Sequence, residues 1–180
     1  MKRTLLSALH CSAACLALLL CGCGAQSLAP YADQKPALDL RAYFNGTLDA
    51  YGLFTDRSGQ VVKRFEVLLA CHWEGNEGTL DESFRYADGT TQKRVWHLTR
   101  RDDKHYLGRA DDVDGVALGE LSGNTLHWNY SLLLPVDGSI YRVQFDDWMY
   151  LMNDKVMLNK ASMSKWGVHL GDVTLSFAKH

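Results

Sequence analysis

The sequence has 180 residues, of which 47% are hydrophobic and 22% are charged, and its formal net charge is −2 at pH 7. This length predicts a single domain that is large enough to bury a core of its own. Because the chain carries no basic tail or stripe, nucleic acid is not expected as a partner.

The N-terminus has the profile of an export signal. Lys2 and Arg3 are followed by a run of mainly Leu, Ala and Cys over residues 5–20, as in the charged and apolar regions of a signal peptide. The run ends in Leu20-Cys21-Gly22-Cys23, which resembles the lipobox of bacterial lipoproteins, with Leu three residues before the modified cysteine and a small residue directly before it. The sequence therefore predicts a signal peptide over residues 1–22 and a lipid, such as palmitate, on Cys23.

The residues around Cys23 predict where the protein is held. Acyl chains anchor a protein in a membrane, because each buried CH₂ contributes about 0.8 kcal/mol. Gly24, in place of an Asp, resembles the signal for transfer to the outer membrane, so we expect the inner face of that membrane, facing the periplasm. Residues 23–36 lack periodicity and end at Pro36, which predicts a flexible tether. An ordinary signal peptide and an uncleaved membrane anchor are the alternatives.

Cleavage before Cys23 changes the charge and the cysteine content. The remaining 158 residues hold 17 basic and 21 acidic residues, for a net charge of −4. Of the five cysteines, Cys71 is the one that is neither in the signal peptide nor lipidated. No intramolecular disulfide is then possible, and Cys71 is predicted to be a small core residue because it alternates with apolar neighbours.

The body of the chain, residues 37–180, has the pattern of β-strands. Turn signals such as Asp88-Gly89 and Asp137-Gly138 recur at short intervals and suit tight hairpins. Between the turns, apolar residues alternate with polar ones, which predicts strands with one buried face. The clearest alternating sets are Phe65, Val67, Leu69, Cys71 and Trp73; Leu126, Trp128, Tyr130, Leu132 and Leu134; and Val173, Leu175 and Phe177.

This pattern predicts an all-β fold of about nine or ten strands, with no convincing helix after Cys23. The intervals between turns are too short for crossover helices, so the strands should pair antiparallel. A meander of this length closes most simply as an up-and-down β-barrel, lipocalin-like in shape, because closure removes the unpaired edges. A β-sandwich is the alternative.

Several short phrases occur in order along residues 40–177. They include Tyr43-Phe44-Asn45-Gly46, Asp56-Arg57-Ser58-Gly59, Tyr86-Ala87-Asp88-Gly89, Gly108-Arg109-Ala110-Asp111-Asp112-Val113 and Asp146-Asp147-Trp148-Met149. In combination they resemble one family of bacterial lipoproteins, the domain-of-unknown-function 3833 family. The resemblance implies a lipoprotein with a lipocalin-like barrel and a loose link to lipids. It implies no activity, because none is established for the family.

Two charged residues are candidates for the interior of the barrel. Glu82 alternates in phase with Leu80 and Phe84, and Arg94 alternates in phase with Trp96. Burying either charge alone is costly, so each is predicted to have a partner. A structural ion pair, a polar anchor for a ligand headgroup and a general acid or base are all compatible with this pattern.

The phrase Asp146-Asp147-Trp148 supplies further candidates. The two aspartates face opposite ways in a strand, so one of them should lie on the inner face or at a barrel rim. Together with Glu82, Arg94 and Trp96, the residues Asp146, Asp147 and Trp148 form the candidate ligand site. The segment around Asp111 and Asp112 is interpreted as a turn whose carboxylates cap backbone N–H groups.

No motif in the sequence predicts a catalytic residue, a metal site or a cofactor. The leading expectation is a non-catalytic binder or carrier of an apolar, lipid-like molecule, held on the membrane through Cys23. An envelope accessory protein that binds another protein, as yet unidentified, is one alternative. An enzyme acting on a lipid through Glu82, Arg94 or the Asp146-Asp147 pair is another.

Overall fold

A computed structural model describes residues 26–136 and 138–180. The predicted signal peptide and Cys23 lie outside these residues. Ten strands follow one another along the chain: β1 (Gly46–Asp56), β2 (Val61–Glu74), β3 (Glu77–Tyr86), β4 (Thr91–Arg100), β5 (His105–Arg109), β6 (Ala117–Ser122), β7 (Thr125–Val136), β8 (Ser139–Leu151), β9 (Val156–Lys165) and β10 (Val168–Lys179).

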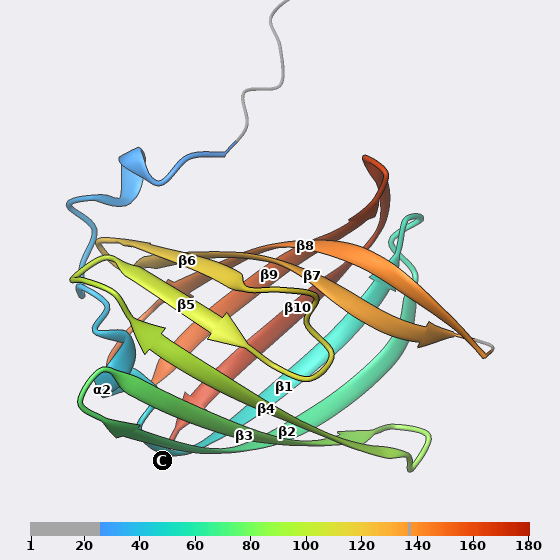
Figure 1. Ribbon diagram of the computed structural model, residues 1–180, viewed down its shortest axis with the longest axis horizontal. Helices are drawn as coiled ribbons and strands as arrows, with labels where there is room; N and C mark the ends of the chain where they lie inside the picture. Colours follow the sequence, from blue (N-terminus) through green and yellow to red (C-terminus); the bar gives the residue numbers. More distant parts are fainter. Residues whose placement is uncertain (1–25, 137) are drawn as a thin grey trace, which may run out of the picture.

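The strands form a closed antiparallel barrel in which each strand pairs with its neighbours in the chain (Figure 1). Closure is made by β1 and β10, which pair from Leu48 opposite Lys179 to Asp56 opposite Gly171. The predicted up-and-down barrel of nine or ten strands is confirmed. The alternative of a β-sandwich is wrong, because β1 pairs with both β2 and β10 and leaves no open edge there.

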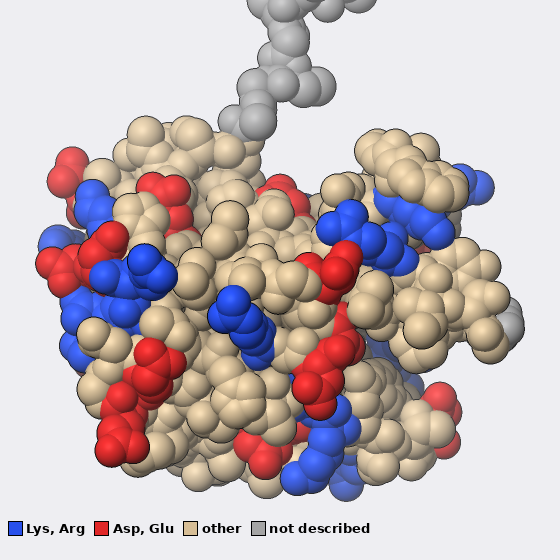
Figure 2. All heavy atoms as spheres, in the orientation of Figure 1, with Lys and Arg blue, Asp and Glu red and all other residues tan. Residues whose placement is uncertain are grey.

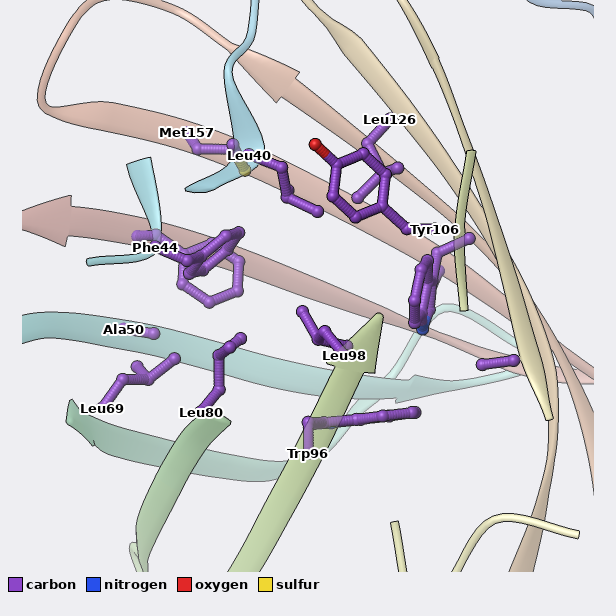
Figure 3. Packing of buried hydrophobic residues seen from close by; sticks show 14 of the residues in the cluster. Leu40, Phe44, Ala50, Leu69, Leu80, Trp96, Leu98, Tyr106, Leu126 and Met157 are labelled. Atoms are coloured by element: carbon purple, nitrogen blue, oxygen red, sulfur yellow. The ribbon is translucent and has the colours of Figure 1, made fainter. Parts of the chain in front are cut away.

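A short helix, α2 (Leu40–Tyr43), lies across one end of the barrel, at the left of Figure 1. Its first turn is capped by the Asp39 side chain, which accepts hydrogen bonds from the backbone N–H groups of Arg41 and Ala42. Leu40 and Phe44 point into the core (Figure 3). No helix was expected after Cys23, because a single helical turn is too short to produce a helical period in the sequence.

The opposite end of the barrel is formed by the loops that follow the odd-numbered strands, and we call it the mouth. The hairpins β1–β2, β7–β8 and β9–β10 extend there, at the right of Figure 1. The mouth and the helix-covered end differ in their side chains. The closed end is filled by apolar residues such as Leu40, Phe44 and Met157 (Figure 3), whereas several large apolar residues at the mouth are exposed.

The inner face of the barrel carries the side chains that alternation predicted. Phe65, Val67 and Leu69 of β2 face inward, as do the alternating residues of β7 and β10. Cys71 is buried as expected, and burial raises the pKa of its thiol to about 12. The thiol is therefore protonated at physiological pH and unreactive.

Residues 26–36, the described part of the predicted tether, contact the outer wall of the barrel. Residues 29–31 form a 3₁₀ turn, η1 (Ala29–Tyr31), and the Tyr31 ring lies 6.2 Å from that of Trp148 on the outer wall. The Gln26 side chain donates a hydrogen bond to the Tyr150 hydroxyl. Residues 23–36 were expected to form a flexible tether, and within the described residues of this segment Tyr31 packs on outward-facing aromatic residues of β8.

Acidic and basic side chains are interspersed over the face shown in Figure 2, without a large patch of one sign. Among the described residues, no helix is long and apolar enough to cross a membrane. Within residues 26–136 and 138–180, no group of three or more His, Cys, Asp or Glu side chains is arranged to hold a metal ion.

Candidate functional site

The barrel encloses a cavity of about 1080 Å³. Its lining extends from Leu40 and Phe44 at the helix-covered end to Ile140 and Lys165 at the mouth. Sites for small ligands usually measure about 300–1,000 Å³, so this cavity has room for a sizeable molecule. The interior is therefore only partly filled by side chains.

Aromatic side chains make up much of the cavity wall. Trp96 of β4 contacts both Trp128 and Tyr130 of β7 edge to face, at 5.8 and 5.4 Å between ring centroids. Tyr130 also stacks on Phe145 at 5.0 Å. Trp96 was expected at the ligand site, and the structure places it on the cavity wall.

Two strand glycines make room for the Trp128 ring. A Cβ atom on Gly108 of β5 would lie 2.4 Å from the ring, and one on Gly119 of β6 would lie 2.2 Å from it. The indole therefore lies flat over the backbone of two short strands.

Glu82 and Arg94 face each other inside the barrel. They occupy paired positions on β3 and β4, both line the cavity, and Arg94 Nη1 lies 3.9 Å from Glu82 Oε2. Both were expected inside and expected to have partners. The structure brings them together, at the outer limit of an ion pair.

The main partner of Arg94 comes from outside the two strands. Nε and Nη2 of Arg94 donate hydrogen bonds to Asp112 Oδ2, at 2.9 and 2.7 Å. Asp112 belongs to the loop between β5 and β6, which crosses toward β7. There the backbone N–H of Leu133 donates to the Asp112 carbonyl oxygen at 2.7 Å. Asp112 was expected only as a turn residue, and its side chain instead neutralises a guanidinium.

Asp147 of β8 is the second buried acid of the cavity. It is 6% exposed, and it accepts a hydrogen bond from the amide of Asn159 on β9. Burial raises its pKa to about 7, although the Asn159 hydrogen bond acts in the opposite direction. Burial likewise raises the pKa of Glu82 to about 7, against the effect of the Arg94 charge. Two carboxylic acids inside the barrel therefore titrate near neutral pH.

Asp146 and Trp148 do not line the cavity. They alternate with Asp147 on β8 and so point to the outer face. Asp146 pairs with the His127 side chain there, and the Trp148 ring stacks on the His127 ring at 4.2 Å between centroids. The sequence had left open which aspartate faces inward, and the structure assigns that position to Asp147. Of the three residues of β8 that were expected at the ligand site, the cavity wall holds Asp147, whereas Asp146 and Trp148 lie on the outer face.

Two polar residues of the cavity wall, Asp112 and Asn159, were not among the residues expected at the ligand site. Asp112 lies in a loop, where no periodicity indicates which side chain points inward. Asn159 of β9 does have such a signal, because it alternates with Met157 and Ala161, both buried. We call Glu82, Arg94, Asp112, Asp147 and Asn159 the polar cluster.

Ten antiparallel strands closed around an apolar cavity define a lipocalin-like, or calycin-like, barrel. The family model for a protein of unknown function, DUF3833, matches residues 17–179. The chain belongs to this family.

Solved structures with the same fold support the assignment of the class. S-type phycobiliprotein lyase CPES from Guillardia theta matches with a TM-score of 0.59 at 6% identity, over 77% of this chain and 89% of its own. Rv2717c from M. tuberculosis matches with a TM-score of 0.56 at 15% identity, over 82% of this chain and 99% of its own. At these identities the likeness shows the fold alone. No curated protein matches the sequence.

Proposed function

We propose that this protein is a non-catalytic binder or carrier of an apolar, lipid-like molecule that occupies the barrel interior. The observation that carries the proposal is the cavity of about 1080 Å³, whose wall is built mainly from aromatic and aliphatic side chains. Apolar surface left facing water is unfavourable. An apolar ligand that fills the cavity removes that cost, and the few polar groups of the wall then fix its orientation.

The exposed apolar residues at the mouth support this proposal. Seven large hydrophobic residues are more than 40% exposed there, including Trp166 at 89% and Ile140 at 72%; the others are Val61, Val62, Val136, Tyr141 and Val168. The tips of the hairpins at the right of Figure 2 are correspondingly rich in uncharged atoms. Such a patch marks an interaction site, and a mouth of this kind suits the exchange of an apolar molecule with a membrane.

The proposal includes export and anchoring. The signal-peptide profile and the Leu20-Cys21-Gly22-Cys23 sequence support cleavage before Cys23 and lipid on that residue. The protein would then act in the periplasm from the inner face of the outer membrane. This location would place an apolar binding cavity where lipids must cross an aqueous space.

Acid–base chemistry on a bound lipid is the second candidate. It is favoured by the pKa of about 7 of both Glu82 and Asp147, because carboxylic acids with such a pKa in a cavity are suited to proton transfer. However, Arg94 is held by Asp112 and Asp147 is held by Asn159, so most of the polar cluster is already paired.

The test is mass spectrometry of the lipids that copurify with residues 24–180 from a bacterial periplasm. The strands of the barrel close on one another within residues 46–179, so this form keeps the whole cavity. We expect one lipid species at about one molecule per protein. Purified protein that contains no lipid and binds no added lipid would contradict the proposal. A lipid that is chemically altered on incubation with the protein would favour the second candidate.

A further inference from the structure

The Glu82 carboxyl group lines the cavity without a hydrogen-bond donor of its own. Its Oε2 atom is covered and has no hydrogen-bond partner among the described residues. The side chain as a whole keeps 13% of its surface accessible and lines the cavity, so the other carboxyl oxygen is the one that a ligand can reach. Nη1 of Arg94, at 3.9 Å, is too distant for a hydrogen bond. A buried acceptor that lacks a donor is costly, so this point of the cavity is suited to a ligand group that donates one.

Arg94 is not free to receive an anionic headgroup. Its Nε and Nη2 groups already donate to Asp112, and its remaining Nη1 is directed toward Glu82. A carboxylate or phosphate on the ligand would have to displace one of these acids. The usual means of binding an anionic lipid, an open guanidinium fork, is therefore occupied.

The charges around Glu82 also disfavour an anion. Asp112 and Asp147 are further acids near it, and Asp81 acts on it from the outer face of β3, where it pairs with Lys93. Tyr86 and Tyr130 contribute hydroxyl groups, and Arg94 is the cation among them. The two lysines of the cavity wall, Lys63 and Lys165, lie at its mouth. Four acids line the cavity, Glu82, Asp111, Asp112 and Asp147. All but the exposed Asp111 surround the one buried cation, Arg94, so an anionic ligand would be repelled.

We propose that the bound molecule is an amphiphile with an uncharged polar end that donates a hydrogen bond to Glu82, in chemical class a long-chain alcohol and not a fatty acid. The inference rests on the proposed function, since it assumes that an apolar molecule occupies the cavity. To the proposed function it adds the chemistry of the ligand's polar end and the residue that binds this end. Glu82 is then a specificity-determining residue, and Arg94 and Asp112 position it.

The test compares three probes of equal chain length at pH 8, where Glu82 is mainly ionised and accepts hydrogen bonds only. Dodecanol has a neutral donor, dodecyl methyl ether has the same chain without a donor, and dodecanoate is an anion. Each is titrated against residues 24–180 by displacement of the uncharged dye N-phenyl-1-naphthylamine. We expect dodecanol to bind about tenfold more tightly than the ether, as for a buried acceptor gaining its donor, and more tightly than dodecanoate.

Two variants assign the preference to Glu82. In Glu82→Gln the new amide can donate to an ether or a carboxylate, so the preference for dodecanol should fall to near equality. Glu120→Gln removes a carboxylate from the exposed outer face of β6 and should leave the preference unchanged. Tightest binding of dodecanoate, or equal binding of alcohol and ether by the unchanged protein, would overturn this inference alone. Failure of all three probes to bind would instead overturn the proposed function.

Discussion

At the scale of single residues, Glu82 and Asp147 link the cavity to pH. Burial raises the pKa of both to about 7, from ordinary values of 4.5 and 3.8. The folded protein therefore binds these two protons more tightly than the unfolded chain does. Between about pH 4 and pH 7 the contribution of these groups to the free energy of unfolding falls as the pH rises, and above pH 7 it is lost.

We accordingly expect the urea midpoint of unfolding to be higher at pH 5 than at pH 8. The double variant Glu82→Gln, Asp147→Asn should show a flatter profile, because neither amide titrates. The exposed Asp56 and Asp88 have lowered pKa values, so they change the free energy of unfolding only at pH values below this range. An unchanged protein whose midpoint is the same at pH 5 and pH 8 would contradict the assignment.

Arg94 offers a second test at this scale. Replacement by Met would leave Asp112 and Glu82 as unpaired acids in the cavity, and breaking a buried pair in this way costs about 3 kcal/mol. The matched control is Arg85→Met on the neighbouring strand, because Arg85 pairs with Glu66 on the exposed outer face. There the expected loss is below about 1 kcal/mol. Equal losses in the two variants, measured by urea unfolding, would show that the interior pair is unimportant.

At the scale of elements, the β9–β10 hairpin is the most exposed apolar part of the mouth. Trp166 lies at its tip with a φ of 53° and is 89% exposed, and Lys165 beside it contacts the rings of Trp166 and Tyr141. Tryptophan is enriched where protein meets the membrane–water interface. The hairpin thus presents an aromatic tip with a cation next to it.

We expect Trp166→Ser to slow the transfer of a fluorescent long-chain alcohol from phospholipid vesicles by several-fold, with little change in affinity at equilibrium. The control is Tyr51→Ser, which removes an exposed aromatic residue from the outer wall of β1. Stopped-flow fluorescence measures both rates. Equal rates for the two variants would exclude the hairpin from the exchange step.

At the scale of elements, the strands could be predicted from the sequence, whereas the direction of loop side chains could not. The strands were predictable because Phe65, Val67 and Leu69 alternate with exposed residues, and a period of two survives in any closed sheet. The inward direction of the Asp112 side chain was not predictable, because a loop residue has no periodicity to indicate where it points. The contact of the Trp128 ring with Gly108 and Gly119 was also not predictable. It depends on the register that puts Gly119 opposite Trp128 and on the packing of Gly108 two strands away, and alternation indicates neither.

At the scale of the whole molecule, Cys23 is the residue on which the proposed location depends. We expect Cys23→Ser to abolish labelling of the protein by radioactive palmitate and to move it from the membrane fraction to the soluble periplasmic fraction. Cys71→Ser is the control, because that thiol is buried in the barrel and should not be acylated. Unchanged labelling of Cys23→Ser would place the lipid on another residue, and absence of labelling in the unsubstituted protein would refute the proposed lipoprotein.

The docking of residues 26–36 on the outer wall has a consequence for orientation. Gln26 is held by Tyr150 near the helix-covered end of β8, and only the two residues between Cys23 and Gln26 would separate the lipid from this fixed point, a reach of about 10 Å. Ile140 lies at the other end of the same strand, ten residues or about 33 Å away. A lipid on Cys23 would then fasten the barrel by one end and hold its opening at a set distance, where it could meet a second surface.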